Sequence, residues 1–137
     1  MVNFFSGFID PESARRLQQR QEKEAELKQQ YPDEAEFQRA LRRWRAANPL
    51  LPGTLHDVVD HIDHLVRVAG VESVGIGADF DGVNLLPVQL EDVSTYPLLT
   101  QELLNRDYTP DQIHAILHGN ILRVLRTAEE AALALRK

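Results

Sequence analysis

Only two stretches of the sequence have the character of buried β-strands, and this scarcity is the strongest constraint on the fold. Residues 1–5 are mainly aliphatic and aromatic, and residues 71–77 are short, β-branched and glycine-rich and come directly after a helical pattern. A parallel strand buried on both faces needs neighbouring strands. Because two strands cannot form such a sheet alone, the sequence predicts part of a larger α/β sheet.

Helices are expected to fill most of the remaining chain. Asp10-Pro11 supplies an N-cap followed by proline at the first helical position, and Thr109 begins a capping box with Gln112. Gly70 should end a strongly amphipathic helix that Thr54 opens. The six expected helices cover residues 12–30, 34–47, 54–69, 97–106, 110–118 and 120–135, with a long loop over 79–96.

The order of these elements is the βαβα pattern of an α/β fold. A (β/α)8 TIM barrel takes about 250 residues and eight strands. We therefore expect the 137 residues to form its last two β/α units, incomplete as a barrel on their own.

Charge and cysteine content exclude several functional classes. A formal charge of -6 argues against nucleic-acid binding, which needs clustered cations, and suits a cytoplasmic protein. With no cysteine, the chain has no disulfide, thiolate metal site or catalytic thiol. No apolar run approaches the roughly 18 residues of a membrane span, and no basic region precedes the apolar start. We expect neither a membrane segment nor a signal peptide.

The segment from Gly75 to Gly82 carries the first candidate site, because its strand ends in a carboxylate. In α/β barrels the catalytic groups lie at the C-terminal ends of strands, so Asp79 would point into the active site. The alternative is that Asp79 or Asp81 only caps the turn, where aspartate and glycine are common. A dinucleotide site is excluded, because the glycines lie within the strand and no helix opens after them.

The second candidate is a set of metal-capable side chains on the helix at 54–69. Their spacing lacks the two histidines four residues apart with an intervening glutamate that mark a catalytic helix, so we favour a solvated or hydrogen-bonded outer face. The remaining histidines stand alone and are expected at the surface or between helices. The candidate set is Asp57, Asp60, His61, Asp63 and His64, and the isolated histidines are His56, His114 and His118.

Six segments, in matching order and spacing, resemble the C-terminal part of the renal (membrane) dipeptidase family. Any one alone would be weak evidence, but six in register are hard to obtain by chance. The resemblance runs along nearly the whole chain. The segments are residues 1–5, 60–64, 68–70, 75–83, 90–97 and 119–125.

The resemblance implies a zinc-dependent dipeptidase in which two zinc ions are bridged by a hydroxide. The family's zinc ligands lie upstream of this chain, so no metal ligand is assigned here. Asp79 corresponds to the family aspartate that transfers the proton to the leaving amine and contacts the substrate, which makes it both catalytic and substrate-binding. Residues 10–53 resemble the helical insertion of bacterial members. We expect residues 1–137 to be a C-terminal fragment of one bacterial metallopeptidase domain, inactive and without tightly bound zinc when alone.

A rival hypothesis is a non-catalytic helical interaction module or a partner-dependent half-barrel. It would use the charged helices at 11–47 and unpaired strand edges, which favour association. Under either hypothesis we expect the isolated chain to be poorly folded, or to self-associate through the apolar face of the helix at 54–69 and the two strands, which the missing N-terminal part would otherwise cover.

Overall fold

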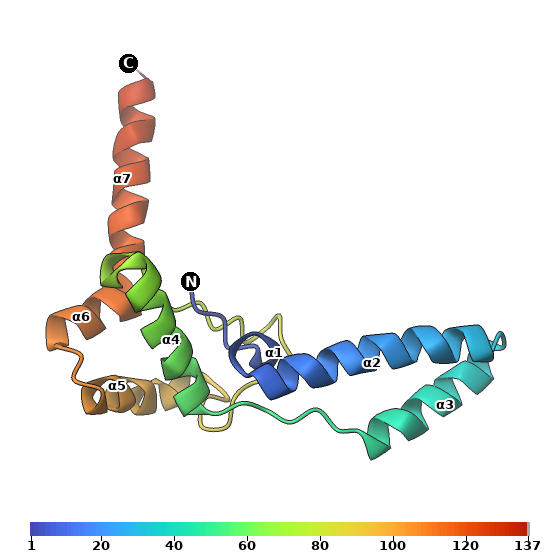
Figure 1. The fold of residues 1–137 in the computed structure, drawn as a ribbon. Coiled ribbons are helices and arrows are strands. Elements are labelled where there is room, and N and C mark those ends of the chain that lie inside the picture. Colours follow the sequence, from blue (N-terminus) through green and yellow to red (C-terminus); the bar gives the residue numbers. More distant parts are fainter. Residues whose placement is uncertain (137) are drawn as a thin grey trace.

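The computed structural model describes residues 1–136, and these are mostly helical (Figure 1). Two short 3₁₀-helices, η1 and η2, and one π-helical turn, η3, accompany the α-helices. The α-helices are α1 (Ser6–Ile9), α2 (Pro11–Gln30), α3 (Glu34–Ala47), α4 (Leu55–Ala69), α5 (Tyr96–Asn105), α6 (Pro110–His114) and α7 (Asn120–Leu135), and the short turns are η1 (Val71–Ser73), η2 (Val93–Thr95) and η3 (Ala115–Gly119).

The helix starts predicted at Asp10, Thr54 and Thr109 and the helix end predicted at Gly70 are confirmed, whereas the expected helix at 110–118 is α-helical only to His114 and continues as η3. The Asp10 carboxylate accepts hydrogen bonds from the first-turn amides of α2. The hydrogen bond from the Ser13 hydroxyl, followed by those from the amides, lowers the pKa of Asp10. Capping boxes begin α4 at Thr54 and α6 at Thr109, and Gly70 ends α4 with φ of 82°. The four-residue helix α1 was not predicted. Its first residue, Ser6, is fully buried and donates to the Leu85 carbonyl oxygen.

The expected α/β architecture, the last two β/α units of a TIM barrel, is wrong, because residues 1–136 contain no β-strand and no sheet. The two expected strands meet only at one parallel bridge between Val2 and Ile76. Helix α1 begins at Ser6 and η1 takes the first residues of the second segment, so each extended stretch is only a few residues long. Such short stretches cannot propagate a hydrogen-bonded ladder.

The main hydrophobic core packs against α4. Side chains from the N-terminal segment, α5, α6 and η3 also contribute to it. Ile62 of α4 is completely buried, as are Val2 and Phe4 of the N-terminal segment. The core-facing residues of α4 and of the N-terminal segment are therefore covered within this chain. The buried cluster comprises Val2, Phe4, Ile9, Leu55, Val58, Val59, Ile62, Val74, Ala78, Leu90, Leu99, Leu103, Ile113 and Ile116.

Two helical arms extend from this core in different directions (Figure 1). Helices α2 and α3 form a hairpin with a small core of its own, made by Leu27, Phe37 and Leu41. Helix α7 stands away from the rest of the chain, and after Asn120 its described residues are exposed. No helix within residues 1–136 combines the length and apolar character needed to cross a bilayer.

Candidate functional site

Asp79 lies in the turn that follows the second extended segment, and the side chain of Asn3, near the N-terminus, holds it. The Asn3 amide donates to the Asp79 carboxylate, with 3.0 Å between Nδ2 and Oδ2. The same Asn3 accepts from the Phe5 amide at 2.7 Å, which fixes its orientation. The parallel bridge between the two segments brings these residues together, although they are 76 positions apart.

The backbone around Asp79 is tightly constrained. Asp79 has a φ of 63°, in the left-handed region that few residues other than glycine adopt. Its carbonyl oxygen accepts from the amides of Gly82 and Val83 at 3.0 and 3.2 Å. A Cβ at Gly82 would lie 2.2 Å from Asp79 Oδ1, so the glycine leaves space for the carboxylate. An exposed acid held in a strained turn is a feature often found at functional sites.

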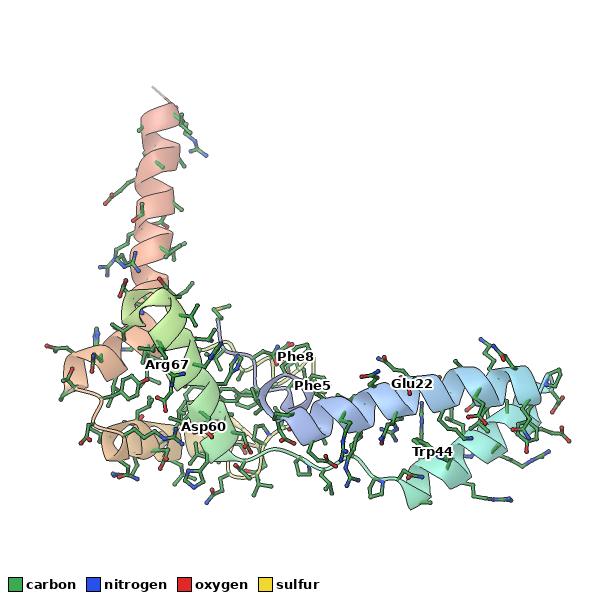
Figure 2. All side chains as sticks on the ribbon, viewed as in Figure 1. Phe5, Phe8, Glu22, Trp44, Asp60 and Arg67 are labelled. Atoms are coloured by element: carbon green, nitrogen blue, oxygen red, sulfur yellow. The ribbon has the colours of Figure 1, made fainter. Side chains whose placement is uncertain are left out.

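A pocket of about 500 Å³ opens beside this turn, and Asp79 lines it together with Asp81. Phe5 and Phe8 form an aromatic wall, with their rings 5.1 Å apart and nearly perpendicular. Figure 2 shows these two phenylalanines next to each other beside α1. The pocket thus combines two carboxylates with an apolar wall, and its volume is in the range of small-molecule sites.

Asp81 differs from Asp79 in its surroundings. In this turn the Gly82 and Val83 amides donate to the Asp79 carbonyl oxygen and not to an aspartate side chain. Asp81 is exposed and lines the pocket. Both carboxylates can therefore meet a molecule in the pocket, and Asp79 is the one that Asn3 positions.

The acidic side chains of α4 are engaged by structural partners. Asp57 completes the capping box of α4, where its carboxylate accepts from the Thr54 amide at 2.7 Å. Asp60 and Asp63 accept from the Arg106 guanidinium, which also bonds Glu102 on its own helix. This arrangement supports the hydrogen-bonded face that we favoured over a metal site.

The ionisation of this cluster is set by its mutual contacts. Burial alone would lower the pKa of Arg106, but its hydrogen bonds to three carboxylates outweigh burial and raise that pKa. The bond from Arg106 in turn lowers the pKa of Glu102. Burial, followed by a 2.7 Å hydrogen bond to Asp63, raises the pKa of Tyr108. Arg106 therefore stays charged and ties α4 to α5.

His61 and His64 do not converge with these acids into a metal site. No group of three or more histidine, aspartate or glutamate residues within residues 1–136 could hold a metal ion. Burial, and then the neighbouring His64, lower the pKa of His61. The half-buried His61 ring therefore resists protonation more than an exposed imidazole would.

His114 and His118 are a pair, and the expectation that each stands alone is wrong. Their ring centroids are 4.0 Å apart with the rings at 72°, where α6 passes into the π-helical turn η3. Both side chains are exposed. The sequence could have indicated this pair, because His118 follows His114 by four positions inside a predicted helix, and that spacing places two side chains on the same helix face.

Comparison with known proteins points to one family. A family model described as membrane dipeptidase (peptidase family M19) matches residues 1–137. The chain is 49% identical over 73 residues to "Dipeptidase 3" of Macaca fascicularis and 48% identical over 73 residues to "Dipeptidase 3" of Homo sapiens. Each alignment covers 53% of this chain and 15% of the relative, so the chain spans only a small part of these curated relatives.

Proposed function

The chain belongs to the membrane dipeptidase family, peptidase family M19, and from that membership we propose that it contributes part of the active site of a dipeptide hydrolase. The observation that supports this proposal is the geometry of Asp79. Asn3 holds its carboxylate, and a strained turn presents it at a pocket with an aromatic wall. Membership of the family alone would not assign a catalytic role to any single residue of this chain.

In this proposal Asp79 is the proton-transfer group. A carboxylate facing the pocket can accept the proton of an attacking water and pass it to the nitrogen that leaves when the peptide bond breaks. The Asn3 amide donates to one oxygen of Asp79 and leaves the other free for this exchange. The ionised carboxylate can also bind the substrate's ammonium group by a charge-assisted hydrogen bond, which explains why one residue would serve catalysis and binding.

Two zinc ions belong to the proposed family mechanism, but the described residues do not fit them. A catalytic zinc normally takes three protein ligands, and two zinc ions need more. The pocket offers Asp79 and Asp81, and the carboxylates of α4 are committed to Arg106 and the capping box. We therefore propose that zinc dependence uses ligands from other residues of a longer protein.

It follows that the isolated chain should not cleave dipeptides. The test is to incubate the purified chain with a panel of dipeptides and excess zinc, and to follow release of free amino acids. We expect no turnover above a sample of the Asp79→Asn variant prepared in the same way. Turnover that a chelator abolishes would contradict the proposal that the metal ligands lie elsewhere.

The same proposal includes three finer points. We propose that residues 10–53, which contain the α2–α3 hairpin, are an insertion within one domain. We also propose a bacterial source, because this insertion resembles that of bacterial members. We propose a cytoplasmic location, which the acidic charge balance supports. Cell fractionation with an antibody against the chain tests the location.

A second candidate function, an interaction module, has one specific observation in its favour. Helix α7 exposes a set of large apolar side chains that the rest of the described chain does not cover. Exposed apolar patches often mark contact sites. A pull-down that depends on α7, combined with no activity in any longer form of the protein, would favour this candidate over the dipeptidase. The exposed residues are Ile121, Leu122, Val124, Leu125, Leu133 and Leu135.

A further inference from the structure

The contact between His114 and His118 brings together two side chains that can bind metal and that the proposed dipeptidase chemistry does not use. The ring centroids lie 4.0 Å apart, and both rings are exposed to solvent. Neutral imidazole is a common ligand for zinc, copper and nickel. Two imidazoles on adjacent turns of a helix can therefore hold one ion between them, with water in the other coordination positions.

The backbone under this pair is unusual. Residues Ala115–Gly119 form a π-helical turn, in which the Asn120 amide donates to the Ala115 carbonyl oxygen five residues earlier. Such turns are rare and are frequently found at functional sites. The wider turn alters the relative position of His114, which precedes it, and His118, which is its fourth residue.

Gly119 is the second unusual feature at the same place. A glycine inside a helix costs about 1 kcal/mol relative to alanine. A Cβ at Gly119 would lie 3.2 Å from His114 Nδ1, tighter than ordinary van der Waals contact. The glycine therefore leaves room for the His114 ring next to His118. The π-helical turn and the helical glycine are both locally unfavourable, and both lie at this histidine pair. Departures from local structural preference are expected mainly at functional sites.

We propose that His114 and His118 form a surface binding site for a divalent transition-metal ion. Metal–nitrogen bonds of about 2.0–2.1 Å place two nitrogens on one ion at most about 4.2 Å apart. Rings already in contact need only small side-chain rotations to reach that arrangement. By the general order of affinities for nitrogen ligands, Cu²⁺ should bind more tightly than Ni²⁺ or Zn²⁺. The site is independent of the proposed dipeptidase function.

The experiment is a Cu²⁺ titration of the full, untagged chain by isothermal calorimetry at neutral pH. We expect one site per chain, and at least about a tenfold loss of affinity in His114→Ala and in His118→Ala, because metal sites lose about 10–100-fold even when a supporting partner is removed. Matched controls are His56→Ala and His64→Ala, which remove exposed histidines elsewhere and should leave the affinity unchanged. Mg²⁺ prefers oxygen ligands and should not bind this site.

A second readout separates metal binding from folding. Because both rings are exposed, the His114→Ala and His118→Ala variants should keep the wild-type helical circular dichroism spectrum. Electron paramagnetic resonance of the Cu²⁺ complex should show nitrogen coordination in wild type that is lost in the double variant. Equal Cu²⁺ affinity in wild type and double variant, or a loss only in His64→Ala, would overturn the proposal. Dipeptidase activity enters neither readout, so failure here leaves the proposed function untouched.

Discussion

Asn120 provides the sharpest test of how the chain holds the turn that carries Asp79. This buried side chain donates from Nδ2 to the carbonyl oxygens of Val71 and Val74, each at 2.7 Å. Through these bonds the start of α7 is tied to η1 and to the extended segment that pairs with Val2. The Asn120→Ala substitution removes both bonds.

The expected cost follows from the burial of the two acceptors. The Val71 carbonyl oxygen also accepts from the Val74 amide, so it keeps one partner. The Val74 carbonyl oxygen lies in the buried part of the contact and loses the Asn120 donor. Two lost bonds at about 0.5–1.5 kcal/mol each, with one acceptor left poorly satisfied, give a destabilisation of about 2–3 kcal/mol.

The assay is urea unfolding followed by circular dichroism at a helical wavelength, which reports on the whole chain. Asn105→Ala is the matched control, because Asn105 is exposed and bonds only neighbouring side chains of α5. We expect Asn105→Ala to change the free energy of unfolding by less than about 0.5 kcal/mol. If Asn120→Ala costs no more than that control, the described anchoring of this segment is wrong.

Two further predictions concern the core and its pH dependence. Ile62→Ala should lower the free energy of unfolding by about 2–5 kcal/mol, because Ile62 is fully buried. Leu133→Ala, on the exposed surface of α7, is the control and should change that free energy little. Equal losses for the two variants in urea unfolding would show that the α4 face is not covered. The pKa of His61 in the folded chain lies below its ordinary value of 6.5. As the pH falls below about 6.5, His61 therefore binds a proton more readily in the unfolded chain than in the folded one, and the free energy of unfolding should fall. His61→Gln should flatten the decline in melting temperature between roughly pH 7 and 5; an unchanged slope would exclude His61 as a source of that decline.

Local signals predicted the helices well because their causes lie within a few residues. The acceptor side chain of Asp10 and the capping boxes at Thr54 and Thr109 act over three positions, and each begins a helix where the sequence indicates. The two expected strands failed for a different reason. An apolar, glycine-containing segment shows that the chain is extended and buried, but a ladder depends on the length and number of its neighbours.

The candidate site was only partly predictable for the same reason. Asp79 was proposed from its place at the end of an extended segment, and its side chain lines a pocket. Its partner Asn3 lies 76 positions away, and nothing local to either residue indicates their contact. The bonds from Arg106 to Asp60 and Asp63 also join distant helices. Their pairing explains why a set of acids that could have held a metal stabilises the fold instead.

The most direct test of the central claim compares Asp79 and Asp81 in a complete enzyme. Such an enzyme can be made by joining this chain to the preceding part of a full-length family member, in place of that member's corresponding segment. Asp79→Asn keeps the size of the side chain and removes its proton transfer, which typically contributes about 10²–10⁴ in rate. Asp81→Asn is the matched control in the same pocket.

We expect kcat for a simple dipeptide to fall by about 10²–10⁴-fold in Asp79→Asn, with metal content unchanged, and to fall much less in Asp81→Asn. Steady-state kinetics with parallel metal analysis measures both. A near-normal kcat in Asp79→Asn together with a large loss in Asp81→Asn would contradict the assignment of Asp79 as the catalytic aspartate.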